Sequence, residues 1–460
     1  EENSTEEGGI TVVKVNKPNM AQKGTINITK TGEVFFGVNV FGEEGKDVIY
    51  QPEYKVSGLT GAIYEVTAAE DIITPDGTLR YHKGDVVDTV TTDNDGFAKS
   101  KELYLGKYTV TEIKAPEGMV INKEPHSVEL TYAGQDVAVT DTSTSFVNER
   151  QKVTVSLEKA IEKNDTFGIG NKDEMKNISF GLYAAEDIVS ASGTVIPTDG
   201  LIEIITLSEN GKATINTDLP FGSYYVKELT TDKHYVLSDT KYPFTFSYSG
   251  QEIAVVEISV NDGKPIENKL IYGSVQGKKI DENGEALGGA VIGLFKTGET
   301  EFTKENALMI TTSKKDGSFS FAKVPYGNWI VREIEQPEGF VLDDTSYEVT
   351  ISENEQVIEV QIVNEYVHGN IKLTKVDADY PDNKLSGAVF EVYKDKNDNG
   401  ILDKEDKLVG TLTETSTGIY EMKELLYGKY LVKETKAPEG FELDTGVYSV
   451  FINEDEKTYD

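Results

Sequence analysis

Four glutamates in this chain occupy positions where a carboxyl group could do acid–base chemistry. Each ends a strand-like run in which an aromatic residue, a hydrophobic residue and the glutamate stand at alternate positions. Successive side chains of a β-strand point to opposite faces, so this spacing places all three on one largely apolar face. A carboxylate there must be neutralised or paired, because burying an unpaired charge is costly. The runs cover residues 107–112, 223–228, 328–333 and 429–434 and end in Glu112, Glu228, Glu333 and Glu434.

A lysine ends the first predicted strand of each repeat and is a candidate partner for the glutamate. It shares a strand face with the apolar residues two and four positions earlier, so it too should point into a core. The third repeat departs from this pattern at Gly277, which makes Lys278 a competing candidate there. The predicted strands cover residues 26–30, 155–159, 275–279 and 371–375 and end in Lys30, Lys159, Lys279 and Lys375.

An asparagine ends the last predicted strand in three of the four repeats. These strands cover residues 145–148, 265–268 and 361–364 and end in Asn148, Asn268 and Asn364. The separation between glutamate and asparagine in these repeats would place a fourth asparagine beyond Asp460. We therefore expect the fourth repeat to be truncated, to lack its closing strand, and to leave Lys375 and Glu434 without an asparagine partner.

The elements between these residues recur in one order and predict all-β modules. The lysine strand is followed by a strand that begins with small residues, by a polar turn, and by the glutamate strand. In three repeats a Pro-Glu-Gly turn comes next, whereas the second repeat has residues 231–234 there. A period of about 95 to 130 residues is that of a domain. We expect a linker over residues 1–21 and domains over 22–149, 150–269, 270–365 and 366–460.

Composition excludes several classes of function. The 460 residues carry a formal charge of −35, which argues against nucleic-acid binding and against anionic membrane surfaces. The chain has no cysteine, so disulfides, cysteine-ligated zinc and thiol nucleophiles are excluded. No apolar run approaches membrane-spanning length, so we expect no membrane insertion in this segment. Without a serine nucleophile elbow, a P-loop or a dinucleotide fingerprint, the sequence does not predict an enzyme that turns over an external substrate.

The order of elements resembles the Cna-B family, the SpaA-type, prealbumin-like modules of Gram-positive pilins and surface adhesins. The matching features are the strand ending in lysine, the Gly-Ala strand, the Tyr-x-Val-x-Glu strand with its Ala-Pro-Glu-Gly turn, and the closing Val-Asn. The resemblance covers nearly everything from residue 22 onward. It implies four tandem, prealbumin- or transthyretin-like and Ig-like β-sandwich domains in an elongated array.

The resemblance also implies a reaction for the three residue types. In this family a lysine amine attacks an asparagine side-chain amide, releases ammonia and leaves an intramolecular isopeptide bond, while a glutamate handles the protons. The alternative is that each lysine and glutamate form a buried ion pair and each asparagine only ends a strand. For this chain the resemblance implies the bonds Lys30–Asn148, Lys159–Asn268 and Lys279–Asn364. The assisting glutamates would be Glu112, Glu228 and Glu333, in the same order.

A loop in the fourth repeat has the spacing of a calcium site. Residues 395–406 place oxygen-bearing residues at the positions that an EF-hand-like loop uses, although position 12 is aspartate where glutamate is usual. The alternative is a solvated acidic loop, and we expect no other cofactor. The predicted ligands are Asp395, Asn397, Asn399, the carbonyl of Ile401, Asp403 and Asp406.

We therefore expect an extracellular stalk segment of an adhesin or pilin-related protein at the cell wall of a Gram-positive bacterium. The full-length protein would be anchored by sortase, and parts outside this chain would bind a host matrix or cell-surface ligand. One alternative is that these domains themselves bind a host ligand, which an exposed apolar or aromatic groove would favour. Another is a sortase-polymerised pilus shaft subunit linked through Lys17, since residues 13–19 resemble a pilin motif.

Overall fold

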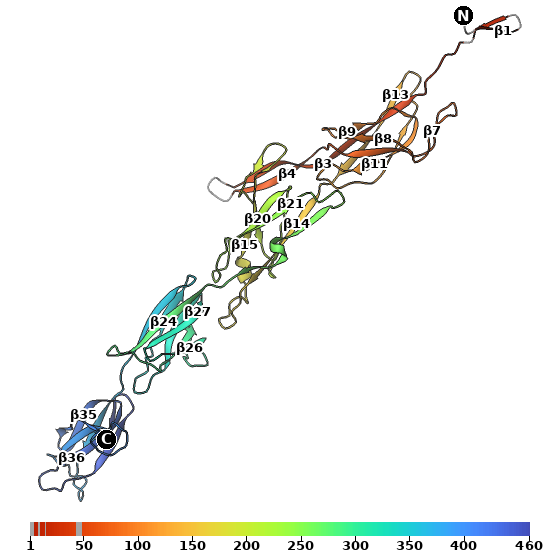
Figure 1. The fold of residues 1–460 in the computed structure, drawn as a ribbon. Coiled ribbons are helices and arrows are strands. Elements are labelled where there is room, and N and C mark those ends of the chain that lie inside the picture. The colour runs from red at the N-terminus through yellow and green to blue at the C-terminus, as the bar shows by residue number, and fades with distance from the viewer. Residues whose placement is uncertain (1–3, 8–9, 14, 43–47) are drawn as a thin grey trace. The chain divides into compact units, whose positions relative to one another are not determined.

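The computed structural model describes residues 4–7, 10–13, 15–42 and 48–460, and strands make nearly all of its regular structure (Figure 1). Within these residues the only helical elements are two 3₁₀ turns, η1 (Glu174–Asn177) and η2 (Val260–Gly263). Contacts divide the chain into two units. The first comprises Glu1–Ile161, Lys172–Asp232 and Leu237–Asn268, and the second Glu162–Asn171, Lys233–Val236 and Lys269–Asp460. The all-β prediction is confirmed.

The third domain shows the architecture in its simplest form. A three-stranded sheet in the order β27-β24-β30 and a four-stranded sheet in the order β26-β25-β28-β29 enclose one hydrophobic core. The first and last strands, β24 and β30, run parallel and in register from Ser274 opposite Val357 to Asp281 opposite Asn364. The strands are β24 (Tyr272–Asp281), β25 (Val291–Lys296), β26 (Met309–Thr312), β27 (Ser318–Pro325), β28 (Gly327–Glu335), β29 (Tyr347–Ile351) and β30 (Val357–Asn364).

The fourth domain repeats this arrangement with a much shorter closing strand. Its sheets have the orders β34-β35-β31-β38 and β33-β32-β36-β37. Although the sequence led us to expect no closing strand, β38 pairs in parallel with Gly369–Ile371 of β31. The strands are β31 (His368–Thr374), β32 (Val389–Lys394), β33 (Lys407–Thr411), β34 (Thr413–Ser416), β35 (Ile419–Leu426), β36 (Gly428–Lys436), β37 (Val447–Ile452) and β38 (Lys457–Tyr459).

The first domain is built around a strand of 19 residues, β3. Its first half pairs in parallel with β13 and antiparallel with β9 and β10. The facing sheet has the order β12-β11-β5-β8. A short hairpin, β1 (Ser4–Glu7) with β2 (Ile10–Val13), lies within the predicted linker. The other strands are β3 (Lys23–Phe41), β4 (Ile49–Gly58), β5 (Ile63–Ala68), β6 (Ile72–Ile73), β7 (Leu79–Tyr81), β8 (Val86–Thr91), β9 (Phe97–Lys99), β10 (Leu103–Tyr104), β11 (Gly106–Lys114), β12 (His126–Leu130) and β13 (Val139–Asn148).

The second domain shares a sheet with the first. The β3–β4 hairpin continues past the first core, β4 bridges to β18 at Ile49 and Leu201, and Phe35 and Val38 pack on the second core. The lysine strand β14 pairs in parallel with β22 and β23. The strands are β14 (Lys152–Ile161), β15 (Ser179–Ala184), β16 (Ile188–Val189), β17 (Val195–Ile196), β18 (Leu201–Thr206), β19 (Lys212–Thr214), β20 (Gly222–Thr230), β21 (Lys241–Phe246), β22 (Val255–Ser259) and β23 (Ile266–Asn268).

Candidate functional site

In each of the first three domains the predicted lysine, glutamate and asparagine meet inside the core. All nine side chains are buried, with at most 3% of any residue exposed. The parallel pairing of first and last strands sets one common register, in which the asparagine stands opposite the residue two positions after the lysine. The lysine partners on the closing strand are Phe146, Ile266 and Ile362.

The first-domain site brings all three groups into direct contact. Lys30 Nζ donates to Asn148 Oδ1 and lies 3.0 Å from Glu112 Oε1. Asn148 Nδ2 donates to the same Glu112 oxygen at 3.0 Å. The amine therefore faces the amide that it would attack, and the carboxyl group lies beside both the amine and the amide nitrogen.

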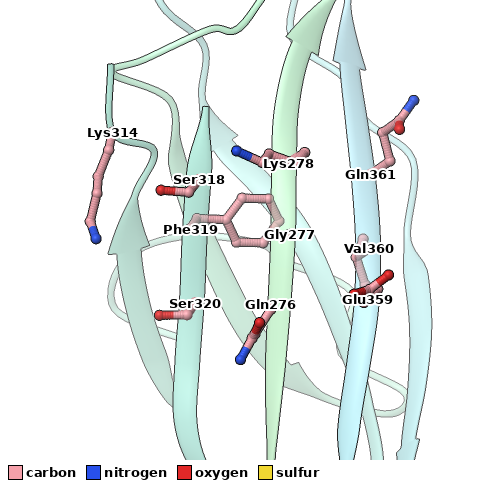
Figure 2. Close-up of a pocket in the computed structure, with 10 residues that line it drawn as sticks. All are labelled: Gln276, Gly277, Lys278, Lys314, Ser318, Phe319, Ser320, Glu359, Val360 and Gln361. Carbon is pink, nitrogen blue, oxygen red and sulfur yellow. The ribbon is translucent and has the colours of Figure 1, made fainter. Parts of the chain in front are cut away.

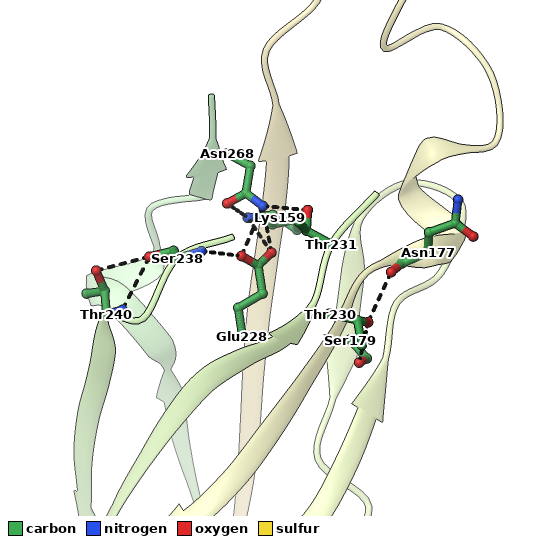
Figure 3. A network of polar contacts seen from close by, with 9 residues as sticks. All are labelled: Lys159, Asn177, Ser179, Glu228, Thr230, Thr231, Ser238, Thr240 and Asn268. Carbon is green, nitrogen blue, oxygen red and sulfur yellow. Dashed lines mark hydrogen bonds and ion pairs between the residues drawn. The ribbon is translucent and has the colours of Figure 1, made fainter. Parts of the chain in front are cut away.

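The second-domain site has the same contacts and two more (Figure 3). Lys159 Nζ donates to Asn268 Oδ1 at 2.6 Å and lies 3.2 Å from Glu228 Oε1. Asn268 Nδ2 lies 2.7 Å from Glu228 Oε1 and 3.0 Å from Oε2, and it donates to Thr231 Oγ1 at 2.8 Å. Thr231 belongs to the segment that replaces the Pro-Glu-Gly turn, so the departure from the sequence pattern adds an acceptor for the amide nitrogen.

In the third domain the structure selects Lys279 over Lys278. Lys279 is fully buried and its Nζ lies 3.5 Å from Glu333 Oε1, whereas Lys278 is exposed and donates to the Asp316 carbonyl at 3.1 Å. Figure 2 shows the Phe319 ring against β24 at Gly277. A Cβ on Gly277 would lie 2.0 Å from that ring, so Phe319 fills the place of the missing apolar side chain.

Three buried polar atoms of the third site lack hydrogen-bond partners. They are Lys279 Nζ, Glu333 Oε1 and Asn364 Oδ1, while Asn364 Nδ2 donates to Glu333 Oε2 at 2.7 Å. Leaving buried polar groups unsatisfied costs free energy. An amide bond between Lys279 and Asn364 would remove the charge of the amine.

The fourth domain holds the lysine and glutamate without an asparagine at the site among the described residues. Lys375 Nζ lies 3.0 Å from Glu434 Oε1, and the lysine side chain is 19% exposed. Glu434 is buried, yet its Oε1 has no partner in hydrogen-bond geometry. The pair is thus formed by the first strand and the glutamate strand, as expected from the sequence.

Burial shifts the pKa values of three of the lysines and one of the glutamates toward their neutral forms. It lowers the pKa of Lys30, Lys159 and Lys279, against the neighbouring glutamate, which acts to raise it. Burial also raises the pKa of Glu333. A neutral amine is the nucleophilic form of lysine, and a neutral carboxylic acid can donate a proton.

A glycine of the polar turn fixes the backbone of each lysine. The lysine N–H donates to the glycine carbonyl at 2.7 to 2.8 Å, and each glycine has a φ of 70° to 78°. A Cβ at these positions would come within 2.2 to 2.9 Å of the lysine carbonyl oxygen. The turn glycine is therefore required by close approach as well as by its conformation. Three of these glycines, Gly96, Gly211 and Gly317, lie in the predicted polar turns. The fourth, Gly418, was not predicted.

The aromatic residue of each glutamate strand carries a polar contact that explains its type. In all four domains its O–H or N–H donates to the carbonyl four residues earlier, at 2.5 to 2.9 Å. Buried tyrosine and tryptophan need such a partner, and phenylalanine could not supply the donor. The alternation that placed this residue beside the glutamate therefore predicted its burial but not this bond. The residues are Tyr108, Tyr224, Trp329 and Tyr430.

The predicted calcium loop folds onto its own backbone. Asp395 is buried and accepts from the N–H groups of Asn399 and Gly400, at 3.2 and 2.9 Å. Asn397 and Asn399 each donate to Asp403 Oδ2 at 3.1 Å. Ile401 is exposed, and Asp406 accepts from the N–H groups of Lys396 and Asp403. Across the part of the chain that the structure describes, no three histidine, aspartate or glutamate side chains gather to hold a metal ion.

Two other sequence predictions concern the surface and the membrane. Lys17 is exposed and lies between strands β2 and β3. Among the described residues there is no helix with the length and apolar character needed to span a membrane.

Comparisons with known proteins agree with the four-domain reading. The model of the SpaA prealbumin-like fold domain matches residues 53–145, 160–262, 273–366 and 369–460. The trypsin-resistant surface T6 protein of Streptococcus pyogenes is 31% identical over 75 residues, which are 16% of this chain and 14% of that protein. Serine-aspartate repeat-containing protein F of Staphylococcus epidermidis is 25% identical over 288 residues, 57% of this chain and 16% of that protein.

Among solved structures, the Bacillus anthracis TIE protein is similar to this chain. The two are 18% identical, and the match covers 92% of this chain and 72% of that one with a TM-score of 0.48. The chain spans about a sixth or less of the length of the two relatives from Streptococcus pyogenes and Staphylococcus epidermidis.

Proposed function

Because the chain belongs to the family of SpaA prealbumin-like fold domains, which occur in Gram-positive pilins and surface adhesins, we propose that it is a stalk segment of such a surface protein. Its first three domains would each be closed by a lysine–asparagine isopeptide bond. The observation that carries this proposal is a buried glutamate that lies beside the lysine amine and accepts from the asparagine amide in three domains, at one strand register. A relative named as a trypsin-resistant surface protein supports a surface role.

The contacts suit an amide exchange in which atoms and protons balance. A proton passes from Lys Nζ to the glutamate, and the neutral amine attacks the asparagine Cγ. As the new C–N bond forms and the old one breaks, the glutamate gives that proton to the departing Nδ2 and takes the second proton that Nζ must lose. Ammonia leaves and carries this last proton away as ammonium. Holding the reactants in a packed core supplies the effective concentration. The glutamate ends as it began, so each site reacts once and needs no cofactor.

The bond would also explain how a cysteine-free stalk resists force and proteolysis. Each link would join the first strand of a domain to its last, closing most of that domain into a covalent loop. A crosslink of this kind restricts the unfolded chain, as a disulfide does. Tension applied at the two ends would then load the covalent bond in place of the strand hydrogen bonds.

Intact-mass spectrometry tests the proposal. Each bond releases one ammonia, about 17 Da, so three bonds predict a deficit of about 51 Da from the sequence mass. Glu112→Ala should reduce that deficit by one ammonia and leave the other two domains unaffected. A chain with the unshifted sequence mass would rule out the cross-links.

We also propose that the fourth-domain loop binds calcium. The spacing of Asp395, Asn397, Asn399 and Asp403 supports it, as do the contacts that bring the last three side chains together. Calcium prefers such carboxylate and amide oxygens, and rotating the two asparagine amides would turn oxygens toward the ion. Its role would be structural, ordering a loop of the stalk.

A further inference from the structure

One backbone contact to the reacting glutamate recurs in all four domains. The N–H of the residue ten positions after the glutamate donates to its Oε2, at 2.8 to 3.0 Å. No motif in the sequence marks these residues. They are Asn122, Ser238, Asp343 and Asp444.

The type of this residue is explained by a second contact. Its side-chain oxygen accepts from the N–H two residues further on, at 2.8 to 3.3 Å. Asparagine, aspartate and serine form such local turns readily. The turn fixes the direction of the N–H that reaches the glutamate, so the side chain and the backbone of one residue act together.

The contact makes the two oxygens of the carboxyl group different. Oε2 is held by the backbone donor, while Oε1 faces the lysine Nζ at 3.0, 3.2, 3.5 and 3.0 Å in the four domains. A hydroxyl oxygen is a weaker acceptor than a carbonyl oxygen, so the backbone N–H bond favours Oε2 as the carbonyl oxygen of the neutral acid, and Oε1 is the oxygen nearest the amine. The proton of the neutral acid therefore belongs on Oε1.

We propose that Asn122, Ser238 and Asp343 are positioning residues for the isopeptide reaction, holding Oε2 so that Oε1 faces the lysine and takes its proton. This inference rests on the proposed function. Asp444 holds Glu434 in the same way in the fourth domain, so the carboxyl group is oriented there without an asparagine.

The third domain offers the sharpest test because it contains the only tryptophan of the chain, Trp329. Asp343→Pro removes the N–H and the charge, whereas Asp343→Asn removes the charge and keeps both the N–H and the turn. Chains are synthesised in a cell-free system in short pulses, chased at pH values from about 6 to 9, quenched in denaturant and digested. The linked peptides of each domain are then quantified by mass spectrometry, and Trp329 emission reports whether the third domain is folded.

We expect Asp343→Asn to form the Lys279–Asn364 bond at close to the wild-type rate. Asp343→Pro should form it about tenfold more slowly or worse, as expected for loss of a hydrogen bond to a charged group. Its rate–pH profile should also shift, since the N–H favours the ionised form of Glu333. The bonds of the first two domains in the same chain serve as internal references and should be unchanged.

Three results separate the possible failures. If wild-type chains form no bonds, the proposed function itself fails. If folded Asp343→Pro matches the wild type in rate and pH profile, or if Asp343→Asn is equally slow, the positioning role is wrong. Should Trp329 show that the proline variant is unfolded, Asp343→Ala decides in its place. It keeps the N–H but loses the turn, and it must be slower than Asp343→Asn for the inference to hold.

Discussion

The third and fourth domains contain the same lysine–glutamate pair but differ in the strand that covers it. In the third, β30 pairs along β24 from Ser274 to Asp281 and the Lys279 side chain is fully buried. In the fourth, β38 pairs only with Gly369–Ile371 and the Lys375 side chain is 19% exposed. The distance from Nζ to Oε1 is nonetheless short in both, at 3.5 and 3.0 Å.

This difference shows which elements build the site. The pair, the turn glycine and the anchor on Oε2 are all present in the fourth domain, so they do not depend on a complete closing strand. The closing strand of the third domain contributes Asn364 and shields the lysine from water. In the proposed reaction, positioning of the proton-transfer groups and delivery of the amide would therefore be separate tasks of separate strands.

Asn364→Ala should make the third domain resemble the fourth and have the largest effect. Releasing a covalent loop of about 85 residues should lower the free energy of unfolding of this domain by about 4 to 5 kcal/mol. Urea denaturation followed by Trp329 fluorescence measures it, because that residue is the only tryptophan and lies in this domain. The control is Asn268→Ala, which should leave the Trp329 transition in place. An unchanged transition for Asn364→Ala would contradict the cross-link.

The converse experiment adds Val-Gln-Ile-Val-Asn, a copy of residues 360–364, after Asp460. The register that pairs Ile371 with Tyr459 would bring the fifth added residue opposite Asp377, two positions after Lys375. That is the asparagine position of the other three domains. We expect one further loss of about 17 Da and a gain of about 4 to 5 kcal/mol in the stability of the fourth domain.

The matched control for this extension is Val-Gln-Ile-Val-Ala, which supplies the strand without the amide. It should show neither the mass loss nor the full gain in thermal stability. If both extensions behave alike, the lysine–glutamate pair of the fourth domain is not poised to react.

Strand alternation and repetition were enough to find the candidate lysine and glutamate residues. A glutamate at the end of an apolar face is anomalous, and its recurrence with a lysine pointed to a buried pair that the structure contains. The contact with asparagine depends on parallel pairing between strands more than 80 residues apart, which no local pattern encodes. The resemblance to a known family supplied that link. The sequence left Lys278 and Lys279 as alternatives because Gly277 breaks the apolar pattern. Phe319, on a neighbouring strand, fills that place in the structure.

Other features were missed because they arise from tertiary context. The β3–β4 hairpin joins the second domain through a bridge between Ile49 and Leu201, and no periodicity predicts a partner so distant. The anchor on the glutamate Oε2 had a visible signal, a turn-forming residue always ten positions later. The contact with the glutamate could not be predicted, because the direction of that backbone N–H is known only from the structure.

The pH dependence of stability should separate linked from unlinked domains. In Asn364→Ala both groups stay titratable, and burial holds the pKa of Lys279 below its usual 10.5 and that of Glu333 above its usual 4.5. As the pH rises past 4.5, the unfolded chain loses a proton that folded Glu333 keeps, so the free energy of unfolding falls until the raised pKa is passed. Above the lowered pKa of Lys279 the folded state has lost its proton first, so stability rises again toward pH 10.5.

This dependence is read from Trp329 denaturation curves at several pH values, as the difference between variant and wild type. A linked wild type would keep Glu333 but have no titrating amine at residue 279, so this difference isolates the rise due to Lys279. The fall due to Glu333 is read from the curve of the variant itself. Adding Glu333→Gln to Asn364→Ala should remove the fall at low pH and keep the rise at high pH. A difference that does not vary with pH would mean that the pair is not buried as described.

The smallest expected effect concerns a loop that also distinguishes the two domains. Residues 395–406 connect β32 to β33, and residues 297–308 occupy the equivalent place between β25 and β26 with the same length but without the alternating acidic and amide residues. Calcium should therefore raise the stability of the fourth domain by about 1 to 2 kcal/mol at saturating concentration and leave the third unchanged. Isothermal titration and thermal unfolding, each with and without chelator, measure this.

Asp403→Asn keeps an oxygen but removes a charge from the site, so it should weaken binding. Equal heats for wild type and Asp403→Asn, or no heat at all, would identify the loop as a hydrogen-bonded turn stabilised by its own backbone.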